Sequence, residues 1–357
     1  MKKLNYNDVV TEQDKVLYTA PGVFLNMGGM FEYVKMWLDE SKVFTNHAHF
    51  LLKNNLGYPK DEVIIFKTIK SDSSIKQIAI IALLNFILPG KIIGRFFRQD
   101  YQELIQSVDT IHVLSASLNN YAFFKWILKK YPKKKIIYTL HDPKPHTEKI
   151  SPLARIIRNH GNKGIFKIAS EKNNFFLHLH SSFLIDNCPK KINEIIIHSH
   201  PLPKTRVIRT RKADGKIRLG FMGRIEHYKG LDVFLQALNS LPQNVTKNIE
   251  VHIIGRGELD EKWNHTTFKT VVSNELVSDQ FFHQNMADLD CLVLPYLNAS
   301  QTGVGYMGLA YNIPMILSET GGLPDVFRLC KTGKSRLVLP NNPKHLEEVL
   351  MQFIIAC

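Results

Sequence analysis

The segment that most constrains the fold of this chain is residues 216–241, because it joins a strand, a cationic loop and a helix. Ile217–Met222 are mostly apolar and end at Gly223, as expected of a strand buried in a parallel sheet. The loop that follows carries Arg224 and Lys229, and the apolar residues after it recur at helical spacing. Glycine lets backbone N–H groups approach a phosphate, while a helix start and two cations supply positive charge. The segment therefore predicts an anion site, although an ordinary crossover with two solvated cations has the same pattern.

Length and alternation predict two α/β domains. A chain of 357 residues is too long for one ordinary core. Strands are expected at residues 15–20, 47–52, 63–66, 110–115 and 135–140, and again at 217–222, 251–254, 268–272, 291–294, 314–317 and 336–339. Their alternation with helical segments indicates a doubly wound sheet in each domain, with ligands beyond the carboxyl ends of the strands. The polar residues 204–215 are the natural linker between a first domain, 1–203, and a second, 216–357.

Several segments of the second half resemble a known family in their residues and their order. They are Phe221–Arg224 with Lys229–Gly230, Val251–Gly257, Asp288–Tyr296 and Pro314–Asp325. Together they resemble the C-terminal domain of family 4 glycosyltransferases, enzymes of the GT-B fold that use nucleotide sugars. The resemblance implies two Rossmann-like domains facing each other across a cleft, the first binding the acceptor and the second the nucleotide sugar.

The resemblance also suggests roles for residues of the first domain. Gly28 and Gly29 occupy the place of a glycine pair that faces the donor diphosphate, where only glycine lets the backbone come so close. His141 ends a Tyr-Thr-x-His strand and matches a histidine that reaches the donor sugar. Asp142 and His146 follow in a loop stiffened by proline and are candidate acceptor contacts or a candidate base. An ordinary loop glycine pair and a histidine that caps a strand end are the alternatives.

In the second domain the resemblance assigns Arg224 and Lys229 to the leaving diphosphate, a role that a divalent ion takes in other enzymes. It implies a retaining hexosyltransferase that needs no metal and no cofactor besides its nucleoside-diphosphate sugar. Both cations are expected on a surface loop. Gly223 belongs to the same donor site, and Gly255 and Gly257 end the next strand, where the base and ribose lie in the family. A simple glycine turn is the alternative for this pair.

The chain departs from the family at two glutamates that normally lie eight positions apart. Counting back from Pro314, these positions hold Ala299 and Met307, which cannot ionise. A helix start follows Ala299, and its unpaired N–H groups and a threonine hydroxyl could replace side-chain charge. The residues expected to bind the diphosphate and sugar there are Gln301, Thr302, Gly303 and Val304. A purely structural, glycine-rich helix start is the alternative.

The positive charge of the chain is concentrated in its first half. The net charge is +14, and residues 1–203 carry 28 Lys and Arg against 17 Asp and Glu. Such a surface attracts anionic lipid or nucleic acid, and given the resemblance we expect an anionic membrane and no nucleic acid. The apolar residues 78–97 are too short and interrupted to span a bilayer. These residues could form a helix in the membrane interface or a helix in the protein core. For the positive charge, the alternative to a membrane-binding surface is a general bias toward lysine.

Cysteine spacing and the N-terminal residues predict a cytoplasmic protein, and the basic first half adds the expectation that it is peripheral on the inner face of the membrane. The four cysteines lie far apart, as in a reducing compartment, and the first residues are too polar for a signal peptide. Two histidine pairs lack a carboxylate or cysteine at metal-ligand spacing and are predicted to be strand-end polar residues, not zinc ligands. These pairs are His178 with His180 and His198 with His200.

The function predicted from these features is transfer of a sugar from a nucleoside-diphosphate sugar to a lipid-linked or glycan acceptor in cell-surface polysaccharide synthesis. A GT-B nucleotide-sugar epimerase would keep the donor site but would need no acceptor. A binding protein with the GT-B fold and no turnover is a third possibility, motivated by the missing glutamates.

Overall fold

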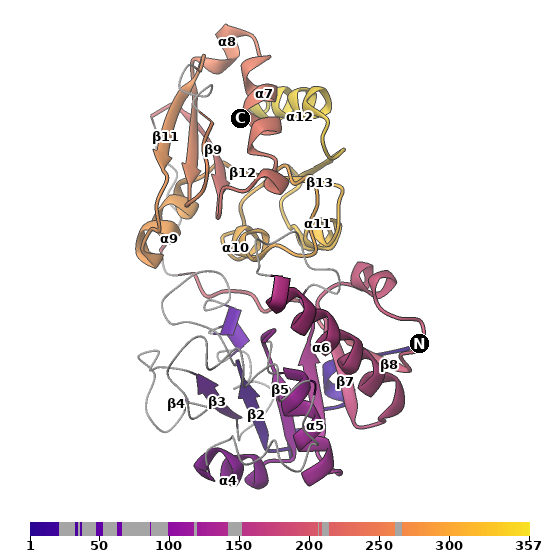
Figure 1. Cartoon of the computed structure of the whole chain (residues 1–357). Coiled ribbons are helices and arrows are strands. Elements are labelled where there is room, and N and C mark those ends of the chain that lie inside the picture. The colour runs from indigo at the N-terminus through magenta and orange to yellow at the C-terminus, as the bar shows by residue number, and fades with distance from the viewer. Residues whose placement is uncertain are drawn as a thin grey trace. The chain divides into compact units, whose positions relative to one another are not determined.

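A computed structural model of the chain describes residues 1–20, 33–34, 36–37, 48–52, 63–65, 86, 99–117, 120–141, 152–205, 207–208, 214–260 and 266–357. The chain forms two compact units, unit 1 from Met1 to Pro201 and unit 2 from Leu202 to Cys357 (Figure 1). The units join just before the predicted linker, 204–215. Among the described residues, no helix is both long and apolar enough to cross a bilayer.

Unit 1 contains an eight-stranded sheet in its described residues, and all of its strand pairs are parallel. The strands are β1 (Lys2–Leu4), β2 (Val16–Thr19), β3 (Ala48–Leu52), β4 (Val63–Ile65), β5 (Thr110–Val113), β6 (Lys135–Thr139), β7 (Phe175–Leu179) and β8 (Glu194–Ile197). Their spatial order is β1-β8-β7-β6-β5-β2-β3-β4. The chain therefore changes direction across the sheet between β2 and β5, which is a topological switch point.

Two cores cover the two faces of this sheet, because side chains alternate along each strand. The helices of unit 1 whose bounds the structure describes are α4 (Gln99–Ser107), α5 (Asn120–Lys130) and α6 (Pro152–Glu171), with 3-10 turns η1 (Tyr6–Asp8) and η3 (Ser182–Asn187). One face packs against Ile105 of α4, Trp126 of α5 and Ile165 of α6. The other face packs against Tyr6 of η1 and the helical residue Trp37.

Unit 2 contains a six-stranded sheet in its described residues, also all parallel. The strands are β9 (Ile217–Met222), β10 (Ile249–Ile254), β11 (Lys269–Ser273), β12 (Cys291–Leu294), β13 (Met315–Ser318) and β14 (Arg336–Val338). Their order, β11-β10-β9-β12-β13-β14, is the third-second-first-fourth-fifth-sixth order of a dinucleotide-binding fold. The switch point lies between β9 and β12.

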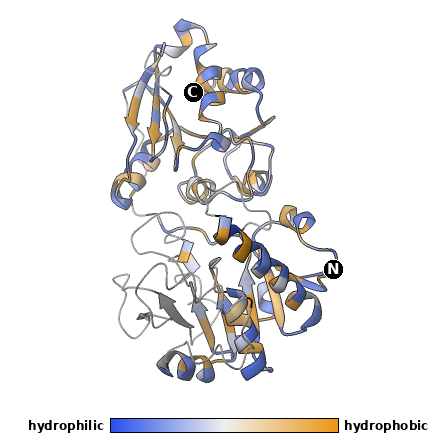
Figure 2. Cartoon of the chain, in the orientation of Figure 1, coloured by the Kyte–Doolittle hydropathy of each residue, from blue (hydrophilic) through white to orange (hydrophobic). Residues whose placement is uncertain are grey.

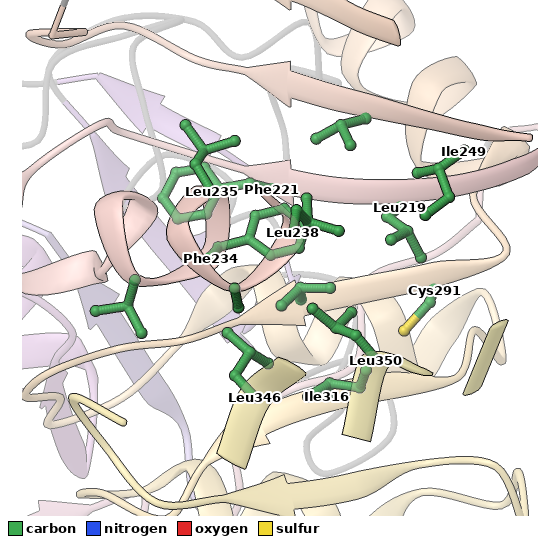
Figure 3. Packing of buried hydrophobic residues seen from close by; sticks show 14 of the residues in the cluster. Leu219, Phe221, Phe234, Leu235, Leu238, Ile249, Cys291, Ile316, Leu346 and Leu350 are labelled. Atoms are coloured by element: carbon green, nitrogen blue, oxygen red, sulfur yellow. The ribbon is translucent and has the colours of Figure 1, made fainter. Parts of the chain in front are cut away.

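The core of unit 2 lies between the sheet and two of its helices. The helices are α7 (Leu231–Asn239), α8 (Gln243–Thr246), α9 (Asp279–Asp288), α10 (Gly303–Ala310), α11 (Leu323–Leu329) and α12 (Pro343–Ile355), with a 3-10 turn η4 (His227–Lys229). Helices α7 and α12 lie side by side next to the sheet (Figure 1). Figure 3 shows Phe234 of α7 and Leu350 of α12 among the buried side chains of β9, β12 and β13. In Figure 2 the strands of unit 2 are mostly hydrophobic, while its helices carry residues of both kinds.

The architecture predicted from the sequence is confirmed: both units are α/β, with a parallel sheet and flanking helices. Each strand expected from the sequence is present to within two residues of its predicted bounds. Of the apolar residues 78–97, only Phe86 belongs to the described part of the chain, so the choice between an interfacial and a core helix stays open.

Candidate functional site

In unit 2 the loops that follow β9 and β12 lie against each other at the switch point. The backbone N–H of Leu297 donates to the carbonyl of Tyr228 at 2.7 Å. Gly230 has a φ of 71°, and a Cβ atom there would lie 2.0 Å from the carbonyl oxygen of Pro295. Only glycine allows this approach. The two loops are therefore joined where a sheet of this topology binds its ligand.

Gly223 lies at the point where three residues predicted for the donor site meet. Its φ is 101°, and a Cβ atom there would lie 3.1 Å from Nζ of Lys229 and 3.2 Å from Cγ2 of Val304. Residues from the end of β9, from η4 and from the first turn of α10 thus surround one small volume. A side chain at position 223 would fill part of it.

Lys229 is the buried cation of this site. The residue is 8% exposed, and its ammonium lies 5.4 Å from the ring centroid of Tyr296. Among the described residues, none provides a carboxylate or a hydrogen-bond acceptor for this ammonium. Because a buried charge without a counter-charge is costly, the position favours an anionic ligand.

Arg224 has a different environment, although it lies in the same loop. Its side chain is 69% exposed, and its Nη1 forms an ion pair with Oε1 of Glu226 at 2.7 Å. The sequence predicts a surface loop for both cations, and this is wrong for Lys229. The difference arises because the loop folds as a 3-10 turn that ends at Gly230, where the chain turns against the Pro295 loop.

Gly255 and Gly257 each have a packing reason to be glycine. Gly255 has a φ of 143°, and a Cβ atom there would lie 2.0 Å from the carbonyl oxygen of Gly223. At Gly257 a Cβ atom would lie 1.9 Å from the carbonyl oxygen of Ile225, and the N–H of Gly257 donates to Oδ1 of Asn274 at 2.9 Å. The two glycines bring the end of β10 against the loop after β9. Their contact with a nucleotide stays a prediction.

The start of α10 offers backbone donors beside Lys229. Thr302 is the N-cap, and its Oγ1 accepts from the N–H of Gly305 at 3.1 Å and lies 3.4 Å from the hydroxyl of Tyr296. The hydroxyl oxygen of Thr302 is therefore already engaged in capping the helix. The N–H groups of Gly303 and Val304 belong to the first turn of the helix and have no intrahelical acceptor. Gly303 is exposed, and Gln301, two residues earlier in the sequence, is half-buried.

The two positions where the family has glutamates are buried and apolar. Ala299 is 3% exposed and Met307 is 6% exposed. A Cβ atom at Gly321 would lie 1.5 Å from the carbonyl oxygen of Ala299, so this part of the loop is closely packed. These two positions therefore supply no charge, and among the described residues the cations of the loop after β9, Lys229 and Arg224, and the backbone amides of α10 are what remains to stabilise an anion.

In unit 1, His141 lies at the carboxyl end of β6, near the switch point of that sheet. Its Nε2 lies 2.9 Å from the carbonyl oxygen of Leu114 and therefore donates to it. The ring of Tyr33 lies edge-on to His141 at a centroid distance of 4.7 Å. Four other predicted site residues of unit 1 lie outside the described residues. These are Gly28, Gly29, Asp142 and His146.

The histidine pairs of β7 and β8 join a buried group of rings. Burial lowers the pKa of His178 and His180 well below the ordinary value, with nearby histidines adding to the effect. Burial also lowers the pKa of His200 to about 4. In the described parts of both units, no group of three or more His, Cys, Asp or Glu residues is arranged to hold a metal ion.

Sequence patterns did not single out two aromatic residues of these sites. Tyr296 lies under the Lys229 ammonium, and Tyr33 lies among His141, His180 and His200. Tyr296 ends the Leu-Pro-Tyr segment after β12, which is the signal that could have identified it. Tyr33 has no local signal, because its contacts come from distant strands.

Comparison with known proteins identifies unit 2. Residues 216–354 match the family described as "Glycosyl transferases group 1". This part of the chain is a group 1 glycosyltransferase domain. It includes Lys229 and α10, so the candidate anion site lies within the family's domain. No curated protein matches the chain.

Solved structures confirm the GT-B fold. Sucrose-phosphate synthase from Thermosynechococcus elongatus is similar over 96% of this chain and 90% of its own, with a TM-score of 0.62 and 12% identity. Anabaena HepE, solved with UDP and glucose, covers the same shares with a TM-score of 0.59 and 14% identity. The lipopolysaccharide outer core galactosyltransferase WaaB, in its apo form, has the same values as HepE. At such identities the likeness concerns the fold alone.

Proposed function

We propose that this chain transfers a sugar from a nucleoside-diphosphate sugar to a lipid-linked or glycan acceptor. The observation that carries the proposal is the buried ammonium of Lys229 beside the open amides of α10, in a group 1 glycosyltransferase domain. An anion of two phosphate groups suits a cation and a helix N-terminus together. HepE has been solved with UDP and with UDP-glucose, which supports a nucleotide sugar as the ligand class.

The proposed chemistry breaks the bond between the anomeric carbon and the diphosphate oxygen, and that oxygen keeps the electron pair. An acceptor hydroxyl forms the new bond and gives up its proton. Lys229 and the amides of Gly303 and Val304 stabilise the diphosphate as it gains charge, each such donor contributing about 3 kcal/mol. Arg224 adds a solvent-exposed charge, and His141 of unit 1 contacts the sugar. In this proposal the anomeric configuration is retained and no metal ion takes part.

A direct test starts with the wild-type protein and nucleoside diphosphates. Calorimetry should detect binding of UDP or GDP, and incubation with labelled nucleotide sugars should transfer label only when an acceptor is added. Conversion of one nucleotide sugar into another without an acceptor would point to an epimerase. Absence of nucleotide binding would overturn the proposal.

Burial of Ala299 and Met307 favours a second candidate, a GT-B protein that binds nucleotide sugars without turnover. An enzyme that lacks both carboxylates has fewer groups to act on the sugar than its relatives have. The same incubation separates the two functions, because tight binding with no product under any acceptor identifies the binding protein.

We further propose that the protein attaches to the cytoplasmic face of the membrane that carries its acceptor, and the first turn of α6 supports the attachment. Leu153 and Ile156 are 52% and 59% exposed, and the cation Arg155 lies between them. Phe86 is also exposed and stacks on His160 of the same helix at 4.1 Å. Exposed apolar side chains among cations are typical of a surface that lies on anionic lipid.

Vesicle sedimentation tests this attachment. The protein should sediment with anionic vesicles and be released by salt, because salt screens exposed charges. Replacing both Leu153 and Ile156 with serine should weaken sedimentation, whereas Leu329→Ser, at a similarly exposed leucine of unit 2, should not. Equal sedimentation of both variants would remove α6 from the proposal.

A further inference from the structure

A chain of hydrogen bonds crosses the face of the unit 1 sheet that Tyr6 covers. The Tyr6 hydroxyl lies 2.9 Å from Nδ1 of His112, and Nε2 of His112 lies 2.8 Å from Oγ1 of Thr139. The same hydroxyl of Thr139 lies 2.8 Å from Nδ1 of His178. Nε2 of His178 then approaches the carbonyl oxygen of His198 at 3.4 Å. The side chains of this chain are buried, so water does not replace these bonds.

The carbonyl of His198 fixes the protonation pattern of the network. It also lies 2.9 Å from Nδ1 of His180. A carbonyl oxygen can only accept, so Nε2 of His178 and Nδ1 of His180 must both carry a hydrogen. Burial keeps both rings neutral, and the remaining nitrogen of each is then an acceptor. Nε2 of His180 therefore accepts from the hydroxyl of Tyr33, 2.8 Å away.

This pattern rules out a proton relay and leaves a positioning role. The branch from Tyr6 and the branch from Tyr33 end at the same carbonyl, which cannot pass a proton between them. The branch that starts at Tyr33 holds the Tyr33 ring in place through the bond from its hydroxyl to His180. That ring is 1% exposed, and its edge-on contacts reach His141 at 4.7 Å and His200 at 4.9 Å.

We propose that Tyr33 is a positioning residue for His141, with its hydroxyl anchored by His180. The inference rests on the proposed function, in which His141 contacts the sugar. The bond from Nε2 of His141 to the carbonyl of Leu114 fixes one edge of the imidazole, and the Tyr33 ring packs against it. With its Nε2–H held by this carbonyl, the imidazole of His141 presents its Nδ1 edge in one direction. Loss of the anchor lets the Tyr33 ring shift, and the orientation of His141 then becomes less defined.

The matched pair of variants is Tyr33→Phe and Tyr6→Phe. Both tyrosines are 1% exposed, and each bonds a buried histidine nitrogen through its hydroxyl, so each change removes one hydroxyl from buried surroundings. The Tyr6 hydroxyl also lies 3.2 Å from that of Tyr18, so Tyr6→Phe removes at least as many bonds as Tyr33→Phe. The ring of Tyr6 contacts His112, His178 and His198. A purely structural network predicts the same outcome for both variants.

We expect Tyr33→Phe to lower kcat by about tenfold, the worth of one well-placed hydrogen bond, and to shift the pH profile of kcat, with little change in donor KM. Tyr6→Phe should lose similar thermal stability and keep both kcat and the pH profile. The inference is overturned if Tyr33→Phe is destabilised like Tyr6→Phe but keeps kcat and its pH dependence.

Nitrogen-15 spectra of the imidazoles provide a readout that does not depend on activity. In the wild type we expect His180 to be protonated on Nδ1 and His141 on Nε2, and the opposite tautomer of His180 would overturn the geometry. The His141 signals should change in Tyr33→Phe and not in Tyr6→Phe. If the wild type transfers no sugar, the proposed function fails, and these spectra alone then decide the positioning role.

Discussion

Lys229 and Arg224 share one loop, and their surroundings indicate different contributions to anion binding. Lys229 is buried against Tyr296, whereas Arg224 is exposed and already pairs with Glu226. Exposed charges interact weakly with a ligand because water and salt screen them, and buried charges are screened much less. The loop's charge and glycines could be predicted from the sequence. The burial of Lys229 could not, because it depends on contact with a loop far along the chain.

Lys229→Met should weaken nucleoside diphosphate binding by at least about tenfold, which corresponds to about 1.4 kcal/mol. Methionine keeps the length of the side chain and its contact with Tyr296 but removes the charge. The melting temperature without ligand should not fall, because removal of an unpaired buried charge relieves a desolvation cost. Calorimetry with UDP and GDP measures the effect.

Arg224→Ala is the control from the same loop and should weaken binding less than Lys229→Met. An equal or larger effect of Arg224→Ala would show that the charge of Lys229 is not what holds the anion. Lys247→Met, at an exposed lysine before β10, should leave binding unchanged.

At the scale of elements, strands were more predictable than helices. Apolar runs that end in polar or glycine residues marked most of the strands, because both faces of a parallel sheet are buried. Helix α6 was not predicted, since it contains two glycines, which disfavour helix. The structure explains one of them: a Cβ atom at Gly164 would lie 2.3 Å from the Tyr121 ring of α5. Edge strand β1 has only three residues, Lys2–Leu4, and owes its place to its pairing with β8.

The start of α10 allows a test in which the helix is kept and one donor is lost. Gly303→Pro removes a backbone N–H at the first helical position, where proline is well tolerated. No heavy atom lies within 4 Å of the Cβ position, so the ring has room. If this amide binds the diphosphate, affinity should fall about tenfold, the value of one charge-assisted hydrogen bond.

Gly303→Ala is the matched control, because it adds a side chain at the same open position and keeps the N–H. It should bind UDP or GDP as the wild type does. Equal affinities for the proline and alanine variants, both shown by circular dichroism to be folded, would exclude this amide from the site.

At the scale of the whole molecule, the two units differ in how they should respond to acid. Burial lowers the pKa of His112, His178 and His180 in unit 1 well below the ordinary 6.5, and lowers that of His200 to about 4. In unit 2, burial acts to raise the pKa of Glu250, but its bonds to Lys269, His252 and Lys216 outweigh this and hold it at about 2. Because its pKa is lower in the folded state, the Glu250 carboxylate stabilises the folded unit, and this contribution is lost only as the pH falls below the ordinary value of 4.5.

Unit 1 should therefore lose stability when the pH falls from 7 to 5.5, a range in which Glu250 of unit 2 stays ionised. In this range the four histidines bind protons in the unfolded chain but not in the folded unit. The free energy of unfolding therefore decreases as the pH decreases. The slope is up to about 1.4 kcal/mol per pH unit for each histidine.

Urea unfolding in a Trp263→Phe background measures this slope, because the remaining tryptophans, Trp37 and Trp126, both belong to unit 1. In the folded unit Nδ1 of His200 lies 3.0 Å from the carbonyl oxygen of Pro201 and donates to it. His200→Asn keeps a donor near this position but cannot titrate, so it should reduce the slope by one histidine's share. A urea midpoint that stays constant or rises on acidification would mean that the buried histidines take up protons in the folded state, contrary to the neutral network inferred for unit 1.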